Sequence, residues 1–268
     1  MRRKGHKWYT VPMPNYTIVN RPDPISGQLC EKMDRILAKE GFTRNDRDPE
    51  TVLVIGGDGT FIYAVHKYLS RLDRVCFFGI HTGTLGFYTD YRDVDFDEFV
   101  HAFINHEYNE YSLPLLEGRT ESEIYYGINE IRVENAVRTQ SMRVYIDNAL
   151  FEIYRGTGMC VSTQLGSTAY NRSVGGAVLQ EGLSLIQMTE IAGIHHSKYR
   201  SLNSPFVMRD STKIRFVSDS FEGAMLGADS EVFPLDHVKE IGIAVSEKRV
   251  RMLKGRDVYY FDRLQSLF

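Results

Sequence analysis

The feature that most constrains the fold is a glycine-rich turn at residues 56–60, Gly-Gly-Asp-Gly-Thr, which lies between two apolar segments. The segment before the turn, 52–55, reads Val-Leu-Val-Ile, which is typical of a buried strand. After the turn, apolar residues recur at helical spacing, at Ile62, Val65, Leu69 and Leu72. We therefore predict that the chain passes from a strand into a helix through this turn.

The composition of the turn favours a phosphate ligand. Its glycines leave the backbone N–H groups open to close approach, and the helix that follows directs its positive dipole end to the same point. Asp58 is unexpected there, because a carboxylate repels phosphate. It is explained if Asp58 orients or deprotonates a hydroxyl that attacks phosphorus, or meets phosphate through a cation. A tight turn with a capping aspartate is the alternative interpretation.

The composition describes an ordinary soluble protein, with 43% hydrophobic and 25% charged residues in a chain of 268. A net charge of −3 gives no general electrostatic reason to expect a nucleic-acid partner. Cys30, Cys76 and Cys160 show neither metal-ligand spacing nor a disulfide framework, which favours a reducing, cytoplasmic location. We expect no membrane partner, because no apolar stretch is long enough to span a bilayer.

The first part of the chain predicts a parallel sheet covered by helices. Continuously apolar strands are expected at 16–19, 52–55 and 75–80, and a helical pattern at 29–37 separates the first two. Ligands of such sheets bind at the carboxyl ends of the strands. The turn after the second strand and a second glycine-containing loop after the third, 81–87, both lie at such ends.

From about Tyr108 the predicted segments become short and alternating, which is typical of an all-β region. Segments 141–146 and 150–155 predict a hairpin around a two-residue turn of Asp and Asn. Later strands are predicted at 213–217, 241–245 and 258–261.

Three polar stretches of this second region carry possible chemistry. Asn129 and Glu130 can hydrogen-bond to a ribose, although a polar pair at a strand edge is the simpler interpretation. In the stretch 162–171, small residues would let a flat base approach the backbone and Tyr170 could stack on it; a capped, hydroxyl-rich turn is the alternative. The third stretch, 175–177, is a Gly-Gly-Ala turn that permits close approach.

Together these motifs resemble the NAD kinase family. The turn 56–60 resembles the signature of the superfamily that also holds diacylglycerol and sphingosine kinases, and the loop 81–87 resembles a second loop of the NAD kinases. The Asn-Glu pair and the stretches 163–170 and 173–176 follow in the order and at the spacing of that family. The resemblance covers roughly residues 16–253 and is closest to the short NAD kinases of Gram-positive bacteria.

The resemblance implies a fold with two domains. We expect a flexible leader at 1–15, an N-terminal α/β domain with a parallel sheet at 16–107, and an all-β, dinucleotide-binding C-terminal domain at 108–250. For the last segment, 251–268, one interpretation is that the chain returns to the first domain. This is the NAD kinase-like two-domain fold.

The resemblance also implies roles for particular residues. Asp58 matches the catalytic residue, which orients or deprotonates the 2′-hydroxyl of the adenosine ribose. Tyr199 matches a tyrosine that reaches a neighbouring subunit's site, which implies an oligomer. The remaining expected contacts to the nucleotides are Gly57, Gly59, Thr60, His81, Asn129, Glu130, Arg155, Thr157, Thr168, Ala169, Tyr170, Ser173 and Ser230. No protein ligand to a metal ion is expected.

Three positions depart from the family pattern. Thr157 replaces an aspartate that contacts the nicotinamide end, so a charge-assisted hydrogen bond is lost. Gln164 replaces a proline, which removes one constraint on the turn. Ser230 follows a late aspartate where the family has glycine or histidine, near the phosphates.

We expect a kinase that transfers the γ-phosphate of ATP, with Mg²⁺, to the 2′-hydroxyl of NAD, and that forms a homotetramer or homodimer with shared sites. Mg²⁺ would be bound mainly through the nucleotide phosphates. The alternative hypothesis is a non-catalytic, dinucleotide-binding paralogue, and the intact Asp58, Asn129 and Glu130 argue against it. A lipid kinase is a weaker rival, because the segment 168–170 favours a nucleotide.

Overall fold

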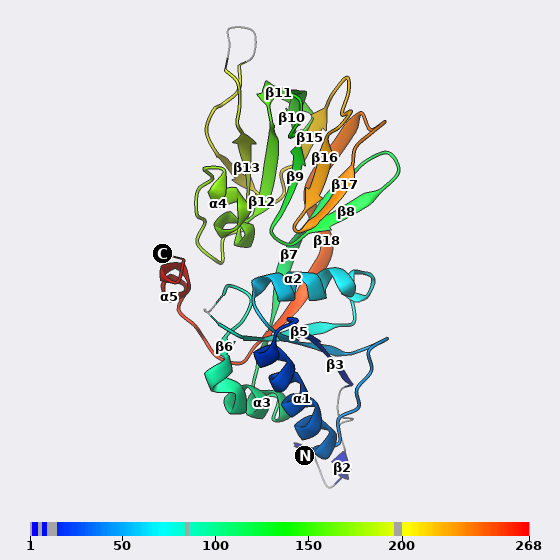
Figure 1. Cartoon of the computed structure of the whole chain (residues 1–268), viewed down its shortest axis with the longest axis vertical. Coiled ribbons are helices and arrows are strands. Elements are labelled where there is room, and N and C mark those ends of the chain that lie inside the picture. The colour runs from blue at the N-terminus through cyan, green and yellow to red at the C-terminus, as the bar shows by residue number, and fades with distance from the viewer. Residues whose placement is uncertain (1, 5–6, 10–14, 84–85, 196–199, 268) are drawn as a thin grey trace. The chain divides into compact units, whose positions relative to one another are not determined.

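The computed structural model describes residues 2–4, 7–9, 15–83, 86–195 and 200–267 of the chain. These residues form two compact units (Figure 1). The first unit holds residues 1–112 together with 250–268, and the second holds 113–249. The border between the units, 112/113, lies five residues after the predicted border between the domains, 107/108. The last residues of the chain belong to the first unit.

The first unit is an α/β layer structure. Its parallel sheet has the strand order β18-β5-β4-β3, with β6 beside the end of β5. Only the last residues of β18 take part in it, through Arg251–Leu253 against Cys76–Phe78. The strands of this sheet are β3 (Tyr16–Asn20), β4 (Thr51–Ile55), β5 (Cys76–His81), β6 (Tyr91–Arg92) and the end of β18 (Glu240–Lys254), and β1 (Arg2–Lys4) and β2 (Lys7–Tyr9) form a separate antiparallel pair. The helices are α1 (Pro24–Lys39), α2 (Asp58–Lys67), η1 (Leu69–Arg71), η2 (Asp93–Asp95), α3 (Phe96–Ile104) and α5 (Tyr260–Gln265).

Helices cover both faces of this sheet, as its apolar strands predict. Figure 1 shows α2 on one face and α1 with α3 on the other. On the face of α1 and α3, Phe78 of β5 stacks on Phe99 at 4.5 Å and meets the edge of Tyr91 at 5.8 Å. On the opposite face, Phe61 of α2 packs against Phe77. The parallel sheet predicted for the first domain is therefore confirmed.

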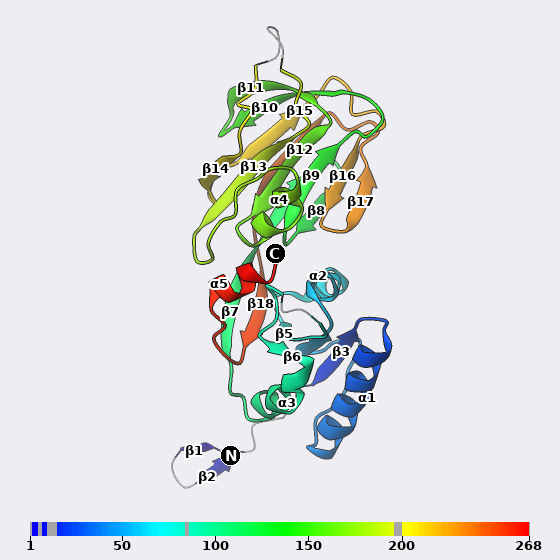
Figure 2. The ribbon, with the colours of Figure 1, turned by 60° about the vertical axis from the view of Figure 1, so that its left-hand side comes forward.

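The second unit is an antiparallel sandwich of two sheets. One sheet has the order β11-β10-β15-β18, and β7 joins it by pairing with β18 and with β8; the other has the order β14-β13-β12-β9-β16-β17. Figure 2 shows β13, β12, β9 and β16 side by side. Its strands are β7 (Asn109–Arg119), β8 (Ile124–Gly127), β9 (Glu130–Glu134), β10 (Gln140–Ile146), β11 (Ala149–Gly156), β12 (Gly158–Thr163), β13 (Leu185–Ile191), β14 (Phe206–Arg209), β15 (Ile214–Val217), β16 (Met225–Ala228), β17 (Glu231–Pro234) and the first part of β18.

The core of the sandwich takes alternate residues from both sheets. Val133 and Val161 of one sheet pack in the same cluster as Val144, Phe216 and Ile243 of the other. Only two short helices interrupt the strands among the described residues of this unit, η3 (Leu165–Thr168) and α4 (Tyr170–Ser173). The predicted all-β second domain is confirmed.

The hairpin predicted around Asp147 and Asn148 is present as β10 and β11. Both turn residues have positive φ angles, 47° and 69°, as a type I′ turn requires. The strand predicted at 258–261 is wrong, because Tyr260 begins α5. Its aromatic residues suit a strand, but Tyr260 and Arg263, one helical turn apart, are both buried.

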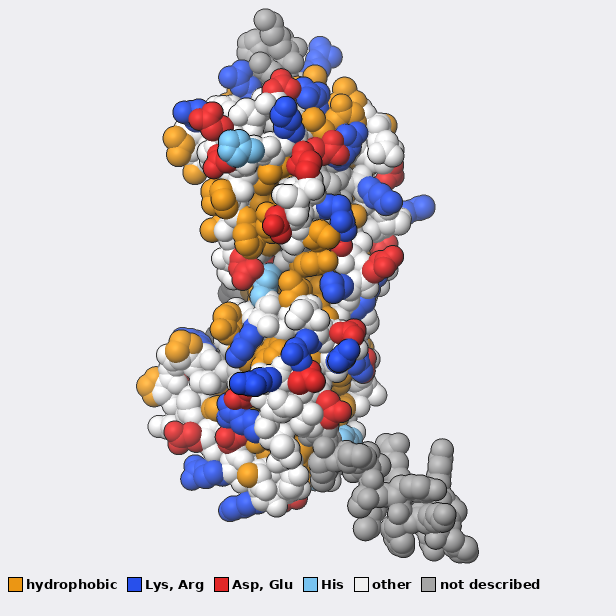
Figure 3. Space-filling model, turned by 90° about the vertical axis from the view of Figure 1, so that its right-hand side faces the viewer, with side chains coloured by type: hydrophobic (Ala, Val, Ile, Leu, Met, Phe, Trp, Pro, Cys, Tyr) orange, Lys and Arg blue, Asp and Glu red, His pale blue; other side chains and the backbone are white. Residues whose placement is uncertain are grey.

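The surface carries charges of both signs. Figure 3 shows basic and acidic side chains interspersed over one face of the molecule. None of the helices in the described part of the chain combines the length and the apolar character that crossing a membrane requires.

Phe78 should carry much of the stability of the first unit, because it is fully buried and contacts aromatic rings on β6 and α3. Replacing it with alanine should lower the free energy of unfolding by about 3–5 kcal/mol, the usual cost of truncating a core phenylalanine. Urea denaturation would measure this. Tyr63→Ala is the control, since Tyr63 on α2 is 58% exposed and should change stability by no more than about 0.5 kcal/mol. Equal effects of the two substitutions would contradict the packing described here.

Candidate active site

The glycine turn connects β4 to α2, as the sequence predicts. Gly57 is the N-cap of α2, and Asp58 is its first residue. A side chain at Gly56 would overlap the Thr60 hydroxyl, so the tight return of the chain requires glycine there. Gly59 is exposed at the start of the helix. The turn therefore presents a helix N-terminus, with Asp58 at its entrance.

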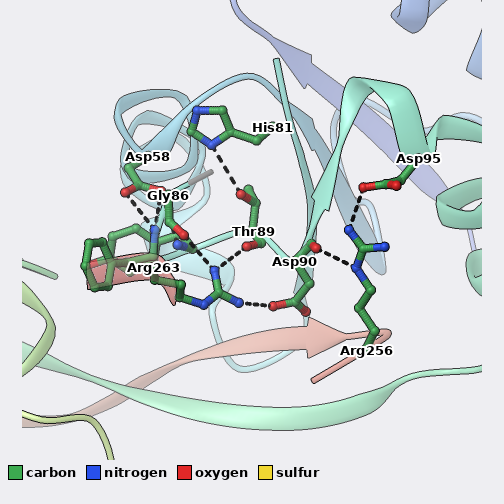
Figure 4. Close-up of polar contacts among 10 residues, drawn as sticks. Asp58, His81, Gly86, Thr89, Asp90, Asp95, Arg256 and Arg263 are labelled. Atoms are coloured by element: carbon green, nitrogen blue, oxygen red, sulfur yellow. Dashed lines mark hydrogen bonds and ion pairs between the residues drawn. The ribbon is translucent and has the colours of Figure 1, made fainter. Parts of the chain in front are cut away.

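The Asp58 carboxylate is held by the backbone of a second loop. The Phe87 N–H donates to both carboxylate oxygens, at 2.9 Å and 3.1 Å, and the Tyr88 N–H donates to Oδ1 at 3.1 Å. A Cβ at Gly86 would overlap the same carboxylate. Figure 4 shows Gly86 of this loop beside Asp58. The backbone of this second loop thus fixes the orientation of the Asp58 side chain in the glycine turn.

His81 lies beside the turn at the end of β5. A Cβ built on Gly57 would stand 3.3 Å from the His81 Nε2 atom. The other ring nitrogen, Nδ1, is 3.3 Å from the Thr89 hydroxyl (Figure 4). Burial lowers the pKa of His81, against the opposing effect of the Asp58 carboxylate, so the ring is mostly neutral at pH 7. The structure therefore brings Gly57, Asp58 and His81 together.

In the second unit, Asp229 organises the backbone around Asn129 and Glu130. Its carboxylate accepts hydrogen bonds from the N–H groups of Ile128 at 2.8 Å, Asn129 at 2.7 Å and Glu130 at 3.2 Å. Asp229 occupies the left-handed region, with φ 51°, at the turn between β16 and β17. Ser230 follows it and is exposed. The late aspartate noted in the sequence therefore fixes the shape of the segment 128–130.

The Glu130 side chain is buried, and it shares its positively charged partner, Arg132, with Glu134. Its Oε1 lies 3.2 Å from the Arg132 guanidinium, which also bonds Glu134 at 2.9 Å. Its Oε2 is buried and has no hydrogen-bond partner among the described residues. Burial, and next the nearby Asp229, raise the pKa of Glu130 to about 8, although Arg132 lowers it. Glu130 is therefore largely protonated at neutral pH and can donate as well as accept a hydrogen bond.

The stretch 162–171 packs directly on Asn129. The Thr163 hydroxyl donates to the Ile128 carbonyl at 2.7 Å and accepts from the Gly166 N–H at 3.0 Å. A Cβ at Gly166 would overlap the Asn129 carbonyl. The close approach expected of this glycine is thus made to the chain's own backbone.

Tyr170 begins α4 and faces the charged residues of β9. The Arg132 guanidinium stacks 4.7 Å from its ring centroid, and its hydroxyl hydrogen-bonds to Glu134. Burial raises the pKa of the Tyr170 hydroxyl. Thr168 and Ala169 are half-buried and Ser173 is exposed beside it. The structure therefore brings residues 168–170 next to the strand that Glu130 begins.

Thr157 lies between β11 and β12, and Arg155 belongs to β11, which is a strand of the other sheet. Thr157 precedes Gly158, the first residue of β12, whereas Glu130 pairs with Ser162 near the end of that strand. Thr157 is thus five residues from Ser162, which corresponds to roughly 16 Å along an extended strand. The predicted residues of this unit thus extend along β12 and do not form one compact cluster. Tyr199 lies outside the residues that the structure describes.

Several residues that build these sites had no local signal in the sequence. Arg263 acts on a loop more than 170 residues away along the chain, and Asp229, although noted as the late aspartate of the family pattern, binds a segment about 100 residues away, so spacing could not reveal the partners of either. Arg132 and Glu134 could have been found from their alternation with Glu130 on one face of β9. Within the described ranges, no group of three or more His, Cys, Asp and Glu side chains is arranged to hold a metal ion.

Two family models match the chain in sequence. The ATP-NAD kinase N-terminal domain matches residues 14–108, and the ATP-NAD kinase C-terminal domain matches residues 128–255. An NAD kinase of Lactobacillus delbrueckii subsp. bulgaricus is 36% identical over 253 residues, which cover 92% of this chain and 96% of that protein. NAD kinase 1 of Halalkalibacterium halodurans is 33% identical over 259 residues, which cover 94% of this chain and 98% of that protein.

Solved structures of two kinases share the fold. Yeast NADH kinase, complexed with NADH, superposes with a TM-score of 0.78 at 19% identity, covering 96% of this chain and 86% of that one. An NAD kinase from Archaeoglobus fulgidus in complex with ATP gives a TM-score of 0.77 at 22% identity, covering 94% of this chain and 99% of that one. With both family models and the relatives above covering most of its length, the chain belongs to the ATP-NAD kinase family.

Proposed function

We propose that Asp58 directs the transfer of the γ-phosphoryl group of ATP to the 2′-hydroxyl of the adenosine ribose of NAD. The overall activity, ATP-dependent phosphorylation of NAD to NADP, follows from membership of the ATP-NAD kinase family. The observation that carries the assignment to Asp58 is its place at the N-terminus of α2, with its carboxylate fixed by the N–H groups of Phe87 and Tyr88.

The proposed step is an in-line displacement at phosphorus. The 2′-oxygen forms a bond to the γ-phosphorus, the bond from that phosphorus to the β,γ-bridging oxygen breaks, and ADP leaves. Asp58 accepts a hydrogen bond from the 2′-hydroxyl and takes its proton as the new bond forms. The backbone N–H groups of the glycine turn and the start of α2 favour the negative charge of the phosphates.

His81 suits a contact with the same reactants. Its ring lies beside Gly57 and is mostly neutral, because burial lowers its pKa. A neutral imidazole can hydrogen-bond to a hydroxyl or a phosphate oxygen without adding a fixed positive charge beside Asp58. We assign it to positioning the nucleotide.

The acceptor dinucleotide is assigned to the described residues along β9 and β12. Asn129 and Glu130 are held by Asp229, and Tyr170 offers an aromatic ring fixed by Arg132 and Glu134. Thr168, Ala169, Ser173, Arg155, Thr157 and Ser230 are proposed as further contacts. The separation of roughly 16 Å along β12 between Thr157 and the residue that pairs with Glu130 suits an extended ligand.

ATP is proposed to arrive with Mg²⁺ on its phosphates. Mg²⁺ retains several waters and is usually bound through phosphates and one or two carboxylates. The Asp58 oxygens retain acceptor capacity beyond the bonds from Phe87 and Tyr88, so the turn suits such a complex. The ion would neutralise charge that develops on the transferred group.

A homotetramer or homodimer in the cytoplasm is the proposed state of the protein. An apolar surface on β11 and β14 supports self-association: Leu150, Phe151 and Ile153 are 52%, 39% and 40% exposed, and Phe151 stacks on Phe206 at 5.2 Å. The cysteines Cys30, Cys76 and Cys160 are free, which suits a reducing compartment. The assignment of Tyr199 to a neighbouring subunit's site rests on the family pattern.

Replacing Asp58 with asparagine should test the assignment most directly. Asparagine retains the shape but removes the carboxylate, so kcat for NADP formation should fall by about two to four orders of magnitude, as expected for a lost general base. Coupled assays with and without ATP would measure it, and calorimetry should find NAD binding largely retained. A near-normal kcat would contradict the role of Asp58. Lack of activity in the unaltered protein would favour a non-catalytic dinucleotide-binding protein.

Glu130→Gln should weaken NAD binding by about 1–3 kcal/mol if the carboxyl group contacts ribose hydroxyls. The same substitution should change how stability depends on pH. The pKa of Glu130 is about 8 in the folded chain, against 4.5 for an ordinary glutamate, so the folded protein holds a proton that the unfolded chain releases between these values. The stabilisation from Glu130 is thus fully present below about pH 4.5 and is lost as pH rises through about 8.

Urea titrations from pH 5 to 9 would measure this difference. The stability of Glu130→Gln relative to the unaltered protein should increase with pH and level off above about 8, with a limit of about 1.4 kcal/mol for each unit of pKa shift. Glu134→Gln is the control, since Glu134 lies four residues after Glu130 on the same face of β9. A constant difference for Glu130→Gln across this range would contradict the protonated state.

Phe151→Glu should reduce the oligomer to smaller species in light scattering, because a charge would then lie on the proposed apolar interface. Ile124→Glu is the matched control, since Ile124 on β8 has similar exposure, 38%, outside that surface. Equal masses for both variants would exclude β11 and β14 as the interface. A monomeric unaltered protein with full activity would exclude the homo-oligomer.

A further inference from the structure

The loop that holds Asp58 is itself held by a buried arginine from the C-terminal helix. Arg263 of α5 donates through Nη1 to the Gly86 carbonyl at 2.6 Å and to the Thr89 carbonyl (Figure 4). Its other terminal nitrogen, Nη2, bonds the Asp90 carboxylate. The guanidinium thus contacts both ends of the segment 86–90 from one side.

This contact is unusual because both charges are out of water. Arg263 is 2% exposed and Asp90 is 3% exposed. Burial raises the pKa of Asp90, and the adjacent Arg263 opposes that rise. A buried arginine persists only where its donors are satisfied, and here a carboxylate and two carbonyls satisfy them.

The geometry of the loop connects Arg263 to Asp58. The carbonyls that Arg263 binds belong to Gly86 and Thr89, and the N–H groups between them, of Phe87 and Tyr88, donate to Asp58 (Figure 4). The segment therefore has its carbonyls fixed on the Arg263 side and its N–H groups directed at the carboxylate. The Tyr260 ring of α5 adds an edge contact to Phe87 at 6.3 Å between centroids.

We propose that Arg263 is a positioning residue for catalysis, which acts on Asp58 through the backbone of residues 86–90. The proposal rests on the function proposed above, in which Asp58 meets the 2′-hydroxyl of NAD. Arginine suits the task because its planar fork presents several donors in fixed directions. Lysine is a single point charge and cannot hold two carbonyls and a carboxylate in one plane.

A loose loop would leave the Asp58 carboxylate able to rotate away from the reacting hydroxyl. Substrate binding would change little, since Arg263 is buried and its hydrogen bonds go to Gly86, Thr89 and Asp90. The expected signature is therefore a loss in kcat and not in KM.

Arg263→Lys provides the first test, in the full-length protein. The kcat for NADP formation should fall by about 10- to 100-fold, because a shift of about 1 Å at a catalytic group can cost about 100-fold. The KM values for NAD and ATP should change by less than about threefold. An unchanged kcat would overturn the proposal. If Arg263→Lys does not fold, Asp90→Asn replaces it in each of the experiments of this section. That substitution keeps the size of the side chain and removes the negative charge that faces Arg263.

Arg256→Lys is the matched control from the same C-terminal segment. Arg256 donates to the Asp90 carbonyl at 2.8 Å and bonds Asp95 (Figure 4), and none of the hydrogen bonds and ion pairs defined among the described residues joins it to residues 86–89. The Arg256→Lys variant should be less stable than the unaltered protein but should not show the fall in kcat expected of Arg263→Lys. Equal losses of kcat in both variants would reduce Arg263 to a general structural role and overturn the proposal.

A double-mutant cycle separates positioning from simple destabilisation. In the Asp58→Asn background, Arg263→Lys should cost less than about threefold in kcat, because its effect passes through a carboxylate that is already absent. The same fold-loss in both backgrounds would overturn the proposal.

Hydrogen exchange supplies a readout that does not depend on activity. In Arg263→Lys the amides of Phe87 and Tyr88 should exchange at least about tenfold faster, while those of β4 remain protected. If the protein makes no NADP, the proposed function fails, and faster exchange at these amides still reports that Arg263 holds the loop. Unchanged exchange would overturn the positioning itself.

Discussion

Each unit depends on one kind of interaction, in which a carboxylate accepts hydrogen bonds from successive backbone N–H groups of a loop. Asp58 binds the N–H groups of Phe87 and Tyr88, and Asp229 binds three, those of residues 128–130. Such charge-assisted bonds are short and directional, so each carboxylate fixes several backbone angles at once. Loops that would otherwise be variable are thereby given one shape.

Glycine makes this arrangement possible where backbone and side chain must come very close. A Cβ at Gly86 would overlap the Asp58 carboxylate, and one at Gly166 would overlap the Asn129 carbonyl. The glycines of the two loops in the first unit therefore serve different purposes. Gly56 allows the return of its own chain onto Thr60, whereas Gly86 admits a side chain from the other loop.

The sequence predicted the architecture well because its signals are local. Buried apolar strands, helical spacing and an Asp-Asn turn each depend on neighbouring residues, and the parallel sheet, the all-β region and the hairpin follow from them. The prediction of a strand at 258–261 was wrong because the aromatic residues of this segment suit a strand. Tyr260 and Arg263 are both buried, and a helix places residues three apart on the same face. The partners of Asp58 and Arg263 depend on contacts between distant segments, which no spacing reveals. The particular residues proposed for substrate contact remain predictions.

The departures from the family pattern lie in the second unit, and at one of them the structure offers a compensation. Gln164, in place of proline, has φ −57°, which is close to the value that a proline ring imposes. Its side-chain amide donates to the Leu179 carbonyl at 3.1 Å, which ties the turn to the segment that follows. The constraint lost with the ring is therefore partly replaced by a hydrogen bond. Thr157 has only its backbone engaged, with Ile191 at 3.0 Å and Asn135 at 2.8 Å, in the bonds that the structure defines. Both residues lie in the second unit, in the stretches proposed to bind the dinucleotide, so we expect their effects to fall on dinucleotide binding.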